Sequence, residues 1–526
     1  DNDVAGKKHA QQIAAALTGI AAEIKVVELP GVLEKGDVSD WLKSHAYDEL
    51  VEAANTAPSW GKPEPLPMLP APSPTPTSDF DYSRTEQANA ERFIAQHGNE
   101  VRYCHLWGKW LIWNGRFWEV DEAEAILRRA VETAKRIGAE AAEALDAKEA
   151  RRVLDFAKES LKGAKLREML KLAQALEGVS VHPNQLDSYP YLFNVQNGTI
   201  DLRFGELLPH RPEDLLTKMA PVEYDPEAEA PLWQAFLQRI MDNQEKVIRF
   251  LQHACGYALT GDISEQVLFI LHGSGANGKS TFLDTLRACW GDSALATPTD
   301  TLTLKKNEPI PNDLARLVGA RLVTAVETED GKQLAESRIK QMTGGEPLVA
   351  RFLHREFFEF RPCFKIFLAT NHRPRVRGTD KAIWRRLKLI PFHIAIPEEE
   401  QDKHFAEKLL AELPGILRWC VDGCLLWQQE GLGVPPEVSN ATDEYRTEQD
   451  VLASFFADHC RIDITMEVFS NHLYAEYVEW CKRNGELPET HRGFNALLTE
   501  RGFKKYRSTG NMLRWRGLGL IDLREE

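Results

Sequence analysis

Residues 266–281 read QVLFILHGSGANGKST, and this stretch decides the fold of the central part of the chain. The apolar run 266–272 is typical of a short buried strand. It leads into G-x-x-x-x-G-K-S, whose main-chain amides can wrap nucleotide phosphates while a lysine supplies charge and a hydroxyl binds Mg²⁺. We therefore predict a P-loop for ATP made of Gly273, Ser274, Gly275, Ala276, Asn277, Gly278, Lys279, Ser280 and Thr281.

The residues after the loop support this interpretation over an ordinary glycine-rich turn. Phe282, Leu283, Leu286 and Cys289 recur at helical spacing and predict a helix that packs one face on a sheet. Since the helix would begin at the loop, the positive end of its dipole would point at the phosphates.

Acidic residues follow the next strand-like run, 321–326 (RLVTAV). A P-loop needs such an acid to hold Mg²⁺ and another to orient the attacking water. Glu327 and Glu329 are the candidates, and their spacing leaves open which of them acts as the base. We expect Ser280 and Glu327 to form the Mg²⁺ site.

Further catalytic candidates lie downstream. The strand-like run 365–369 (KIFLA) is followed by Thr370 and Asn371, whose amide could contact the γ-phosphate or the attacking water. Arg385 and Arg386 follow beside Trp384. In a ring of subunits such arginines can reach a neighbour's γ-phosphate, although an ordinary surface or phosphate-contact charge is the alternative.

The order of these motifs resembles the superfamily 3 helicase module of phage- and plasmid-type primase-helicases. The matching segments are GSGANGKST, VETE, IKQMTGGEPLVAR, FFEFRP, KIFLATNHRP, WRRL and IPF. Residues 108–110, 197–202 and 256–261 resemble the domain that precedes the motor in that family. The resemblance covers roughly residues 82–392.

The resemblance implies an AAA+ ATPase assembled as a ring, with six subunits, that moves 3′ to 5′ on single-stranded DNA in replication. Lys340 and residues 343–345 match an additional motif of the family. The next segment, 348–360, would form a hairpin in the channel, with Arg351 on it and His354 and Arg355 near its tip as DNA contacts. A purely structural hairpin is the alternative.

Composition limits the partners and the compartment. With 43% hydrophobic and 27% charged residues the 526-residue chain reads as a folded soluble protein of several domains, without a membrane segment or leader, and we expect a cytoplasmic location. A formal net charge of −15 confines DNA contacts to local patches. The eight cysteines lack zinc spacing, so we expect reduced thiols.

Before the motor, the chain divides at a Pro-rich linker, residues 58–78, which cannot build a core. Residues 1–57 resemble part of a TOPRIM primase domain. Asp1, Asp3, Asp37 and Asp40 match its metal-binding carboxylates, but the earlier catalytic glutamate and the zinc region are absent. We therefore expect no unaided primer synthesis.

Residues 79–240 read as an α+β domain with hairpins around 102–120 and 194–208. Four tryptophans at 107, 110, 113 and 118 could form a base-stacking platform, but aromatic packing of a small sheet is the commoner use. Residues 241–450 hold the motor.

The last region, 451–526, predicts helices at 471–482 and 490–501 and a strand pair at 503–507 and 512–518, which reads as a winged helix. Its positive residues suit a DNA contact, Arg507 and Arg514 above all, although a solvated charged surface is an equal alternative. The positive residues are Arg492, Arg501, Lys504, Lys505, Arg507, Arg514 and Arg516.

The sequence thus predicts a multidomain α/β protein with an AAA+ P-loop core of superfamily 3 type. An α+β domain would precede this core and a winged helix would follow it. The leading function is a replicative DNA helicase of a phage, prophage or plasmid that binds single-stranded and forked DNA, itself and other replication proteins. An origin-binding ATPase that loads other proteins, or a truncated primase, remains as an alternative.

Overall fold

The computed structural model describes residues 84–144, 146–304, 312–327, 331–351, 357–376, 381–508 and 511–521, with Val27, Trp41, Glu49 and Leu50. The chain forms two compact units, Asp1–Ser83 and Arg84–Glu526. The predicted Pro-rich linker and the carboxylates Asp1, Asp3, Asp37 and Asp40 lie outside the described residues. The motif-bearing residues 266–281 lie in the second unit.

The centre of this unit is a parallel sheet in which the described strands follow the order β13-β7-β12-β9-β8. Its strands are apolar and mostly buried because helices cover both faces, as in other parallel sheets. The predicted strands at 266–272, 321–326 and 365–369 are confirmed. The bounds are Leu268–His272 (β7), Ala294–Ala296 (β8), Leu322–Glu327 (β9), Lys365–Thr370 (β12) and Leu387–Pro391 (β13).

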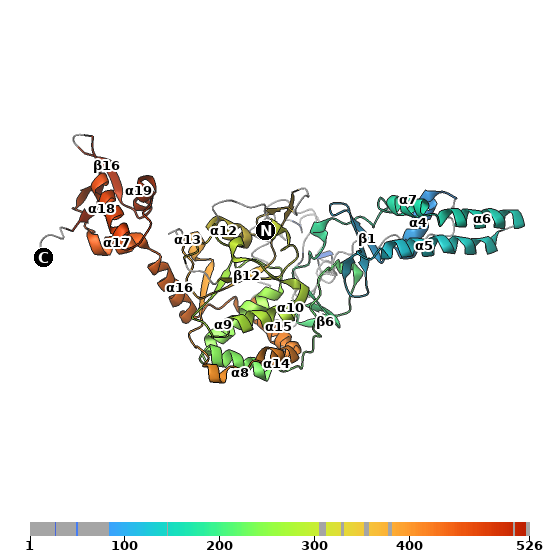
Figure 1. The fold of residues 1–526 in the computed structure, drawn as a ribbon, viewed down its shortest axis with the longest axis horizontal. Coiled ribbons are helices and arrows are strands. Elements are labelled where there is room, and N and C mark those ends of the chain that lie inside the picture. The colour runs from blue at the N-terminus through green and yellow to red at the C-terminus, as the bar shows by residue number, and fades with distance from the viewer. Residues whose placement is uncertain are drawn as a thin grey trace. The chain divides into compact units, whose positions relative to one another are not determined.

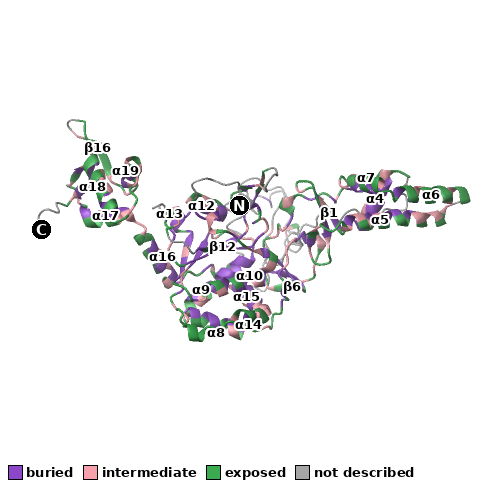
Figure 2. Cartoon of the chain, in the orientation of Figure 1, coloured by how far each residue is buried: buried purple, intermediate pink, exposed green. Residues whose placement is uncertain are grey.

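Two groups of helices cover the sheet (Figure 1). One cluster of buried side chains joins α8 (Pro231–Ile240), α9 (Glu245–Leu259), α10 (Lys279–Trp290), α14 (Phe405–Ala411) and α15 (Leu413–Glu430) to one face. A second cluster joins α12 (Glu336–Gly344), α13 (Lys381–Trp384), α16 (Pro436–Glu448) and the short α11 (Asn312–Ala315) to the other. In Figure 2 the buried residues gather on the sheet and on the inner sides of these helices.

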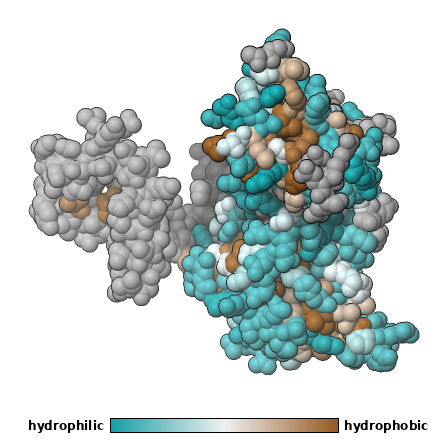
Figure 3. Space-filling model, turned by 90° about the vertical axis from the view of Figure 1, so that its left-hand side faces the viewer, coloured by the Kyte–Doolittle hydropathy of each residue, from teal (hydrophilic) through white to brown (hydrophobic). Residues whose placement is uncertain are grey.

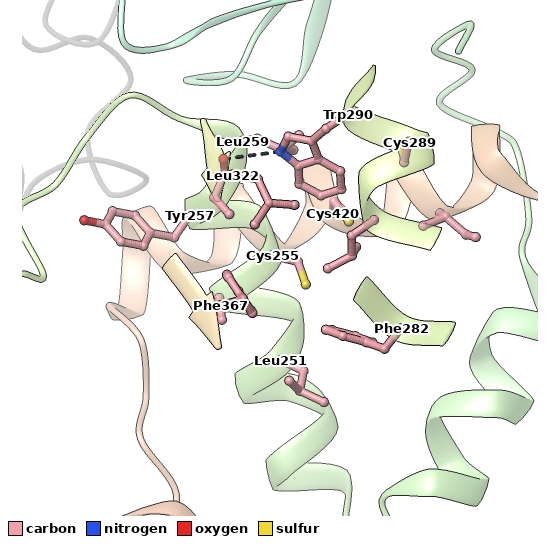
Figure 4. Packing of buried hydrophobic residues seen from close by; sticks show 14 of the residues in the cluster. Leu251, Cys255, Tyr257, Leu259, Phe282, Cys289, Trp290, Leu322, Phe367 and Cys420 are labelled. Carbon is pink, nitrogen blue, oxygen red and sulfur yellow. Dashed lines mark hydrogen bonds between the residues drawn. The ribbon is translucent and has the colours of Figure 1, made fainter. Parts of the chain in front are cut away.

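Glycines let α9 and α15 pack closely. A Cβ atom on Gly256 would lie 2.1 Å from the main-chain nitrogen of Cys424, and one on Gly423 would lie 2.2 Å from the carbonyl of Gln252. Figure 4 shows the apolar side chains around this contact, including Cys255 of α9 and Cys420 of α15. This core contains residues from both predicted regions, 79–240 and 241–450, so the two regions share it.

Two small sheets precede the motor, and both predicted hairpin regions are confirmed. The first is the antiparallel β1-β2-β3 (Val101–Cys104, Lys109–Trp113, Trp118–Val120) and the second is β4-β5-β6 (Leu192–Val195, Gly198–Asp201, Glu206–Leu208). Trp110 and Trp118 are buried, and Trp118 donates from Nε1 to the Pro212 carbonyl at 2.7 Å. Trp107 and Trp113 pack against the core that contains Trp118, and Trp110 belongs to a second core. The tryptophans therefore pack this region and do not form an open stacking platform.

Helices accompany the first of these sheets. They are α4 (Glu86–His97), α5 (Ala125–Ile137), α6 (Ala147–Ser160) and α7 (Gly163–Ala173). The 3₁₀ turns are Gly138–Glu143, Pro183–Gln185, Pro212–Asp214, Gly291–Ser293, Thr299–Thr301 and Glu398–Glu400. Within the described ranges, no helix combines the length and the apolar character that crossing a membrane requires.

The C-terminal region contains the predicted helices and strand pair. They are α18 (Ser470–Arg483), α19 (His491–Glu500), β16 (Lys504–Arg507) and β17 (Leu513–Arg516). The structure adds α17 (Val451–His459), β14 (Cys460–Arg461), β15 (Glu467–Phe469), which pairs with β17, and β18 (Gly519–Leu520). This order of elements is compatible with a winged helix, and that assignment stays a prediction. On the face that Figure 3 turns to the viewer, the coloured residues are mainly hydrophilic, with small apolar patches among them.

Candidate nucleotide-binding site

The P-loop connects β7 to α10 at the carboxyl edge of the sheet. Gly278 has φ +82°, and a Cβ atom there would lie 2.7 Å from Ile240 of α8, so both the turn and the packing require glycine. A Cβ atom on Gly273 would lie 2.1 Å from the Phe392 carbonyl. At Gly275 it would meet no atom within 4 Å. Two glycines thus fit the loop to the protein, while Gly275 faces open space that a ligand can approach.

Hydrogen bonds tie the loop to the segment that follows β13. Asn277, which is buried, donates from Nδ2 to the Phe392 carbonyl at 3.0 Å. The main-chain nitrogen of Phe392 donates to the His272 carbonyl at 2.7 Å, and that of Ile396 donates to the Ala276 carbonyl at 2.7 Å. The loop is therefore preorganised, with its conformation set by residues more than 100 positions away in the chain.

Lys279 lies inside the loop and is 6% exposed. Its ammonium donates to the carbonyls of Gly273 (2.6 Å) and Ser274 (3.2 Å) and to Oδ1 of Asn277 (2.8 Å). Burial lowers the pKa of Lys279 to about 8 because the low-dielectric surroundings disfavour the charged form. Ser280 is exposed on the first turn of α10, where its hydroxyl is accessible to a metal ion.

Strand register brings the other predicted groups to the same edge. Thr370, the last residue of β12, pairs with His272 of β7 on one side and with Glu327 of β9 on the other. Since neighbouring strands lie about 4.8 Å apart, Glu327 and the start of the P-loop are separated by about 10 Å across β12. Glu327 is buried, Asn371 is exposed just beyond β12, and Glu329 lies outside the described residues.

This donor set fits a triphosphate with Mg²⁺. The loop offers main-chain amides and an ammonium to phosphate oxygens, and the N-terminus of α10 adds its dipole. The Ser280 hydroxyl and the Glu327 carboxylate are oxygen ligands of the type that Mg²⁺ prefers. The carboxyl edge of a parallel sheet, where these groups converge, is the usual ligand-binding edge of α/β folds.

The two neighbouring arginines differ in their surroundings. Arg386 is 7% exposed and donates to Oγ1 of Thr343 (3.1 Å), to the Ala382 carbonyl (2.6 Å) and to Oε1 of Gln266 (3.2 Å). Arg385 is exposed and donates to Oε1 of Gln266 at 2.7 Å. Both arginines were predicted to reach a neighbouring subunit. Arg386, however, is buried between α12 and α13 of its own chain.

The two strands of the predicted hairpin are paired, while its place in a channel stays a prediction. β10 (Leu348–Ala350) and β11 (Phe358–Phe360) pair antiparallel, with Leu348 opposite Phe360. The guanidinium of Arg351 lies 4.5 Å from the ring centre of Phe357, which is 57% exposed. His354 and Arg355 lie outside the described residues. Lys340 is half-buried in α12.

In the C-terminal region, several of the positive residues have acidic neighbours. Arg514 and Arg516 both lie 3.4 Å from carboxylate oxygens of Glu467, and Arg501 pairs with Asp450. Arg507 is exposed and hydrogen bonds to Asn511. The cluster is therefore less positive than its sequence suggests.

Sequence reasoning missed two cationic groups that the fold brings into the motor. One is Arg373, two residues after Asn371: burial first, and then the charges of Arg373 and Lys279, lower the pKa of His272. Lys365 is 2% exposed and donates to carbonyl oxygens of Thr260, Asp262 (3.0 Å) and Cys363 (3.3 Å). The only sequence signal was a charged residue in or beside an apolar strand.

The sequence matches two protein families and several viral proteins. Residues 90–242 match the family described as "D5 N terminal like", and residues 271–386 match a family of unknown function, DUF5906. The chain is 30% identical to "Putative helicase L207/L206" of Acanthamoeba polyphaga mimivirus over 59% of its length, and 22% identical to "Putative helicase 184R" of Invertebrate iridescent virus 6 over 67%. These matches span 35% and 40% of the two relatives, so the chain covers less than half of each.

Among solved structures, the chain is similar to the apo structure of the NrS-1 C-terminal region. The TM-score is 0.45 and the identity 12%, over 82% of this chain and 98% of the other.

Proposed function

We propose that this chain is an ATP-driven replicative DNA helicase of the phage-type primase-helicases. The D5 N terminal like match and the helicase-named viral relatives support this premise. The observation that carries the proposal is the convergence of the P-loop, Glu327 and Asn371 at one edge of the parallel sheet. Nucleotide hydrolysis needs these three kinds of group in one place.

Each group has a distinct task in the proposed reaction. The loop amides and Lys279 hold the β- and γ-phosphates, and Ser280 with Glu327 would hold Mg²⁺, which supplies charge neutralisation when bound. Glu327 or Glu329 accepts the proton of the attacking water. Asn371 orients that water or the γ-phosphate from the end of β12. The product of this chemistry is ADP and phosphate.

A neighbouring subunit would complete the site through Arg385. This residue precedes β13, and β13 runs parallel to β7, so Arg385 lies at the amino edge of the sheet while the P-loop of the same chain lies at the carboxyl edge. The five residues Leu387–Pro391 span about 16 Å between those edges. Arg385 is therefore too far from its own P-loop but accessible to another subunit's. We propose a ring of six subunits, as in the family that the chain resembles.

Single-stranded DNA would pass through this ring in the 3′ to 5′ direction. The hairpin β10-β11, with Arg351, His354 and Arg355, and Lys340 are the proposed phosphate contacts in the channel, while Arg507 and Arg514 would contact duplex at a fork. The proposed setting is the cytoplasm of a bacterium or of an infected host, together with other replication proteins.

A strand-displacement assay on forked DNA tests the proposal. With ATP and Mg²⁺ the protein should release the labelled strand, and with a non-hydrolysable analogue or with Lys279→Ala it should not. ATP hydrolysis without strand release would support an origin-binding loader instead. Absence of DNA-stimulated hydrolysis would refute both. Labelled oligoribonucleotide products would contradict the expectation that the chain makes no primers unaided.

A further inference from the structure

The loop that carries Asn371 is held on one side by α16. Thr370 and His372 form a local turn in which the His372 amide donates to Oγ1 of Thr370 at 3.2 Å. This turn presents Asn371 to solvent at the nucleotide edge of the sheet. Residues 373–376 follow and contact α16 and the residue after it.

Three contacts fasten the segment to the last two turns of α16 and the residue that follows. Arg373 Nη1 lies 2.5 Å from Oε2 of Glu448. The Tyr445 hydroxyl donates to the Pro374 carbonyl, and the Val376 amide donates to Oε1 of Gln449 at 3.1 Å. Tyr445 is fully buried in the sheet-facing core, so α16 is a firm anchor for the loop.

The charge of Arg373 also acts on a residue of the P-loop strand. His272 is at the carboxyl end of β7. Burial is the largest cause that lowers the pKa of His272 to about 4, and the charge of Arg373 is the second, ahead of Lys279. The charge of Glu448 opposes the shift. The charge of Arg373 therefore acts on His272, which precedes Gly273, while the guanidinium is paired with Glu448. Its side chain is 21% exposed, whereas that of Glu448 is 57% exposed.

On the opposite side, the same segment is hydrogen bonded to the chain after β9. The Leu334 amide donates to the Arg375 carbonyl at 2.9 Å, and the Arg375 amide donates to the Lys332 carbonyl at 2.8 Å. These main-chain bonds do not depend on side-chain identity. The Asn371 loop is therefore held on two sides. The ion pair with Glu448 is the charged contact, and it can be removed by mutation.

We propose that Arg373, held by Glu448, is a positioning residue that fixes Asn371 for ATP turnover. The inference rests on the proposed function, because Asn371 needs a γ-phosphate or an attacking water to orient. Arg373 acts through the loop geometry and transfers no proton. When the ion pair is lost, nucleotide still binds to the P-loop, which is anchored independently through Phe392 and Ile396.

The test is steady-state ATP hydrolysis by the full chain with single-stranded DNA. Glu448→Ala and Arg373→Ala should lower kcat roughly 10- to 100-fold, the scale of a misplacement of about 1 Å, with KM for ATP unchanged. Glu430→Ala is the matched control, since Glu430 forms an exposed ion pair with Arg249 at 2.6 Å elsewhere in the motor. It should leave kcat unaltered. The exchange Arg373→Glu with Glu448→Arg should recover part of the activity.

A double mutant separates positioning from general damage. If Arg373 acts through Asn371, then Asn371→Ala with Arg373→Ala should be no slower than Asn371→Ala alone, because the two residues act as one unit. Multiplying effects would overturn the inference, as would full kcat in Glu448→Ala. A wild-type protein that hydrolyses no ATP would instead refute the proposed function, so the two failures are distinguishable.

Discussion

Positive charges are held in opposite ways in the motor and in the C-terminal region. In the motor, Lys279, Lys365 and Arg386 are buried and each donates to oxygen atoms of its own chain. In the C-terminal region, Arg514 and Arg516 share the carboxylate of Glu467 near the surface. Burial fixes a charge at one position, which suits chemistry, whereas exposure leaves it adjustable and sensitive to salt, which suits binding to a polyanion.

The largest effect should come from the buried charge of the P-loop. Lys279→Ala removes the ammonium that faces the phosphates and leaves the carbonyls of Gly273 and Ser274 without that donor. ATP hydrolysis should fall to background because nucleotide binding is lost, as measured by phosphate release and by binding of a fluorescent ATP analogue. Lys246→Ala, on the exposed side of α9, is the control and should keep wild-type activity.

The two adjacent arginines should separate chemistry from stability. Arg385→Ala should lower turnover about 10³-fold, the lower end for a trans-acting arginine, with an unchanged melting temperature. The sequence suggested the same outcome for Arg386→Ala, but that change leaves Thr343 and the Ala382 carbonyl without a donor. We expect it to cost about 3 kcal/mol of folding free energy. Thermal unfolding and single-turnover kinetics of both variants check this, and equal melting temperatures would contradict the structural role of Arg386.

This contrast also explains what the sequence could predict. The P-loop, its flanking strand and helix and the antiparallel hairpins are local patterns, and they lie where predicted. Adjacent arginines look alike in a sequence. Arg386 is distinguished by its burial and by its hydrogen bond to Thr343, which lies 43 positions away in the chain. The tryptophans of the first sheet pose the same problem, since packing against distant residues such as Pro212 decides whether their rings are available.

The pH dependence of ATP binding should report the buried lysine. The pKa of Lys279 is about 8 in the free protein, and bound phosphates favour the charged form, so binding requires proton uptake once the pH exceeds 8. Affinity should be nearly constant below pH 7 and then fall as the pH rises through 8, by up to about tenfold per pH unit. Calorimetric titrations in buffers of different ionisation enthalpy measure that uptake. In Lys279→Arg the guanidinium stays charged, so its weaker binding should lack this dependence.

The smallest effect should come from the C-terminal acid. Glu467 accepts a hydrogen bond from Tyr506 and lies beside Arg514 and Arg516; the Tyr506 hydrogen bond, followed by these arginines, lowers its pKa, so it is ionised at neutral pH. If this surface binds DNA, its negative charge opposes the phosphates, and Glu467→Gln should tighten binding to forked DNA about two- to fivefold, the range of an exposed ion pair.

The control for this variant is Glu479→Gln, which removes an acid of α18 that is 53% exposed and pairs with Lys482 at 3.6 Å. Fluorescence anisotropy at several salt concentrations should show a gain for Glu467→Gln that shrinks as salt is added, because exposed charges are screened within about 10 Å at 0.1 M. Equal affinities of both variants and the wild type at low salt would mean that these positive residues form only a solvated surface. DNA would then bind to the motor alone. The buried charges of the motor would serve function, whereas the exposed charges of the C-terminal region would only interact with solvent.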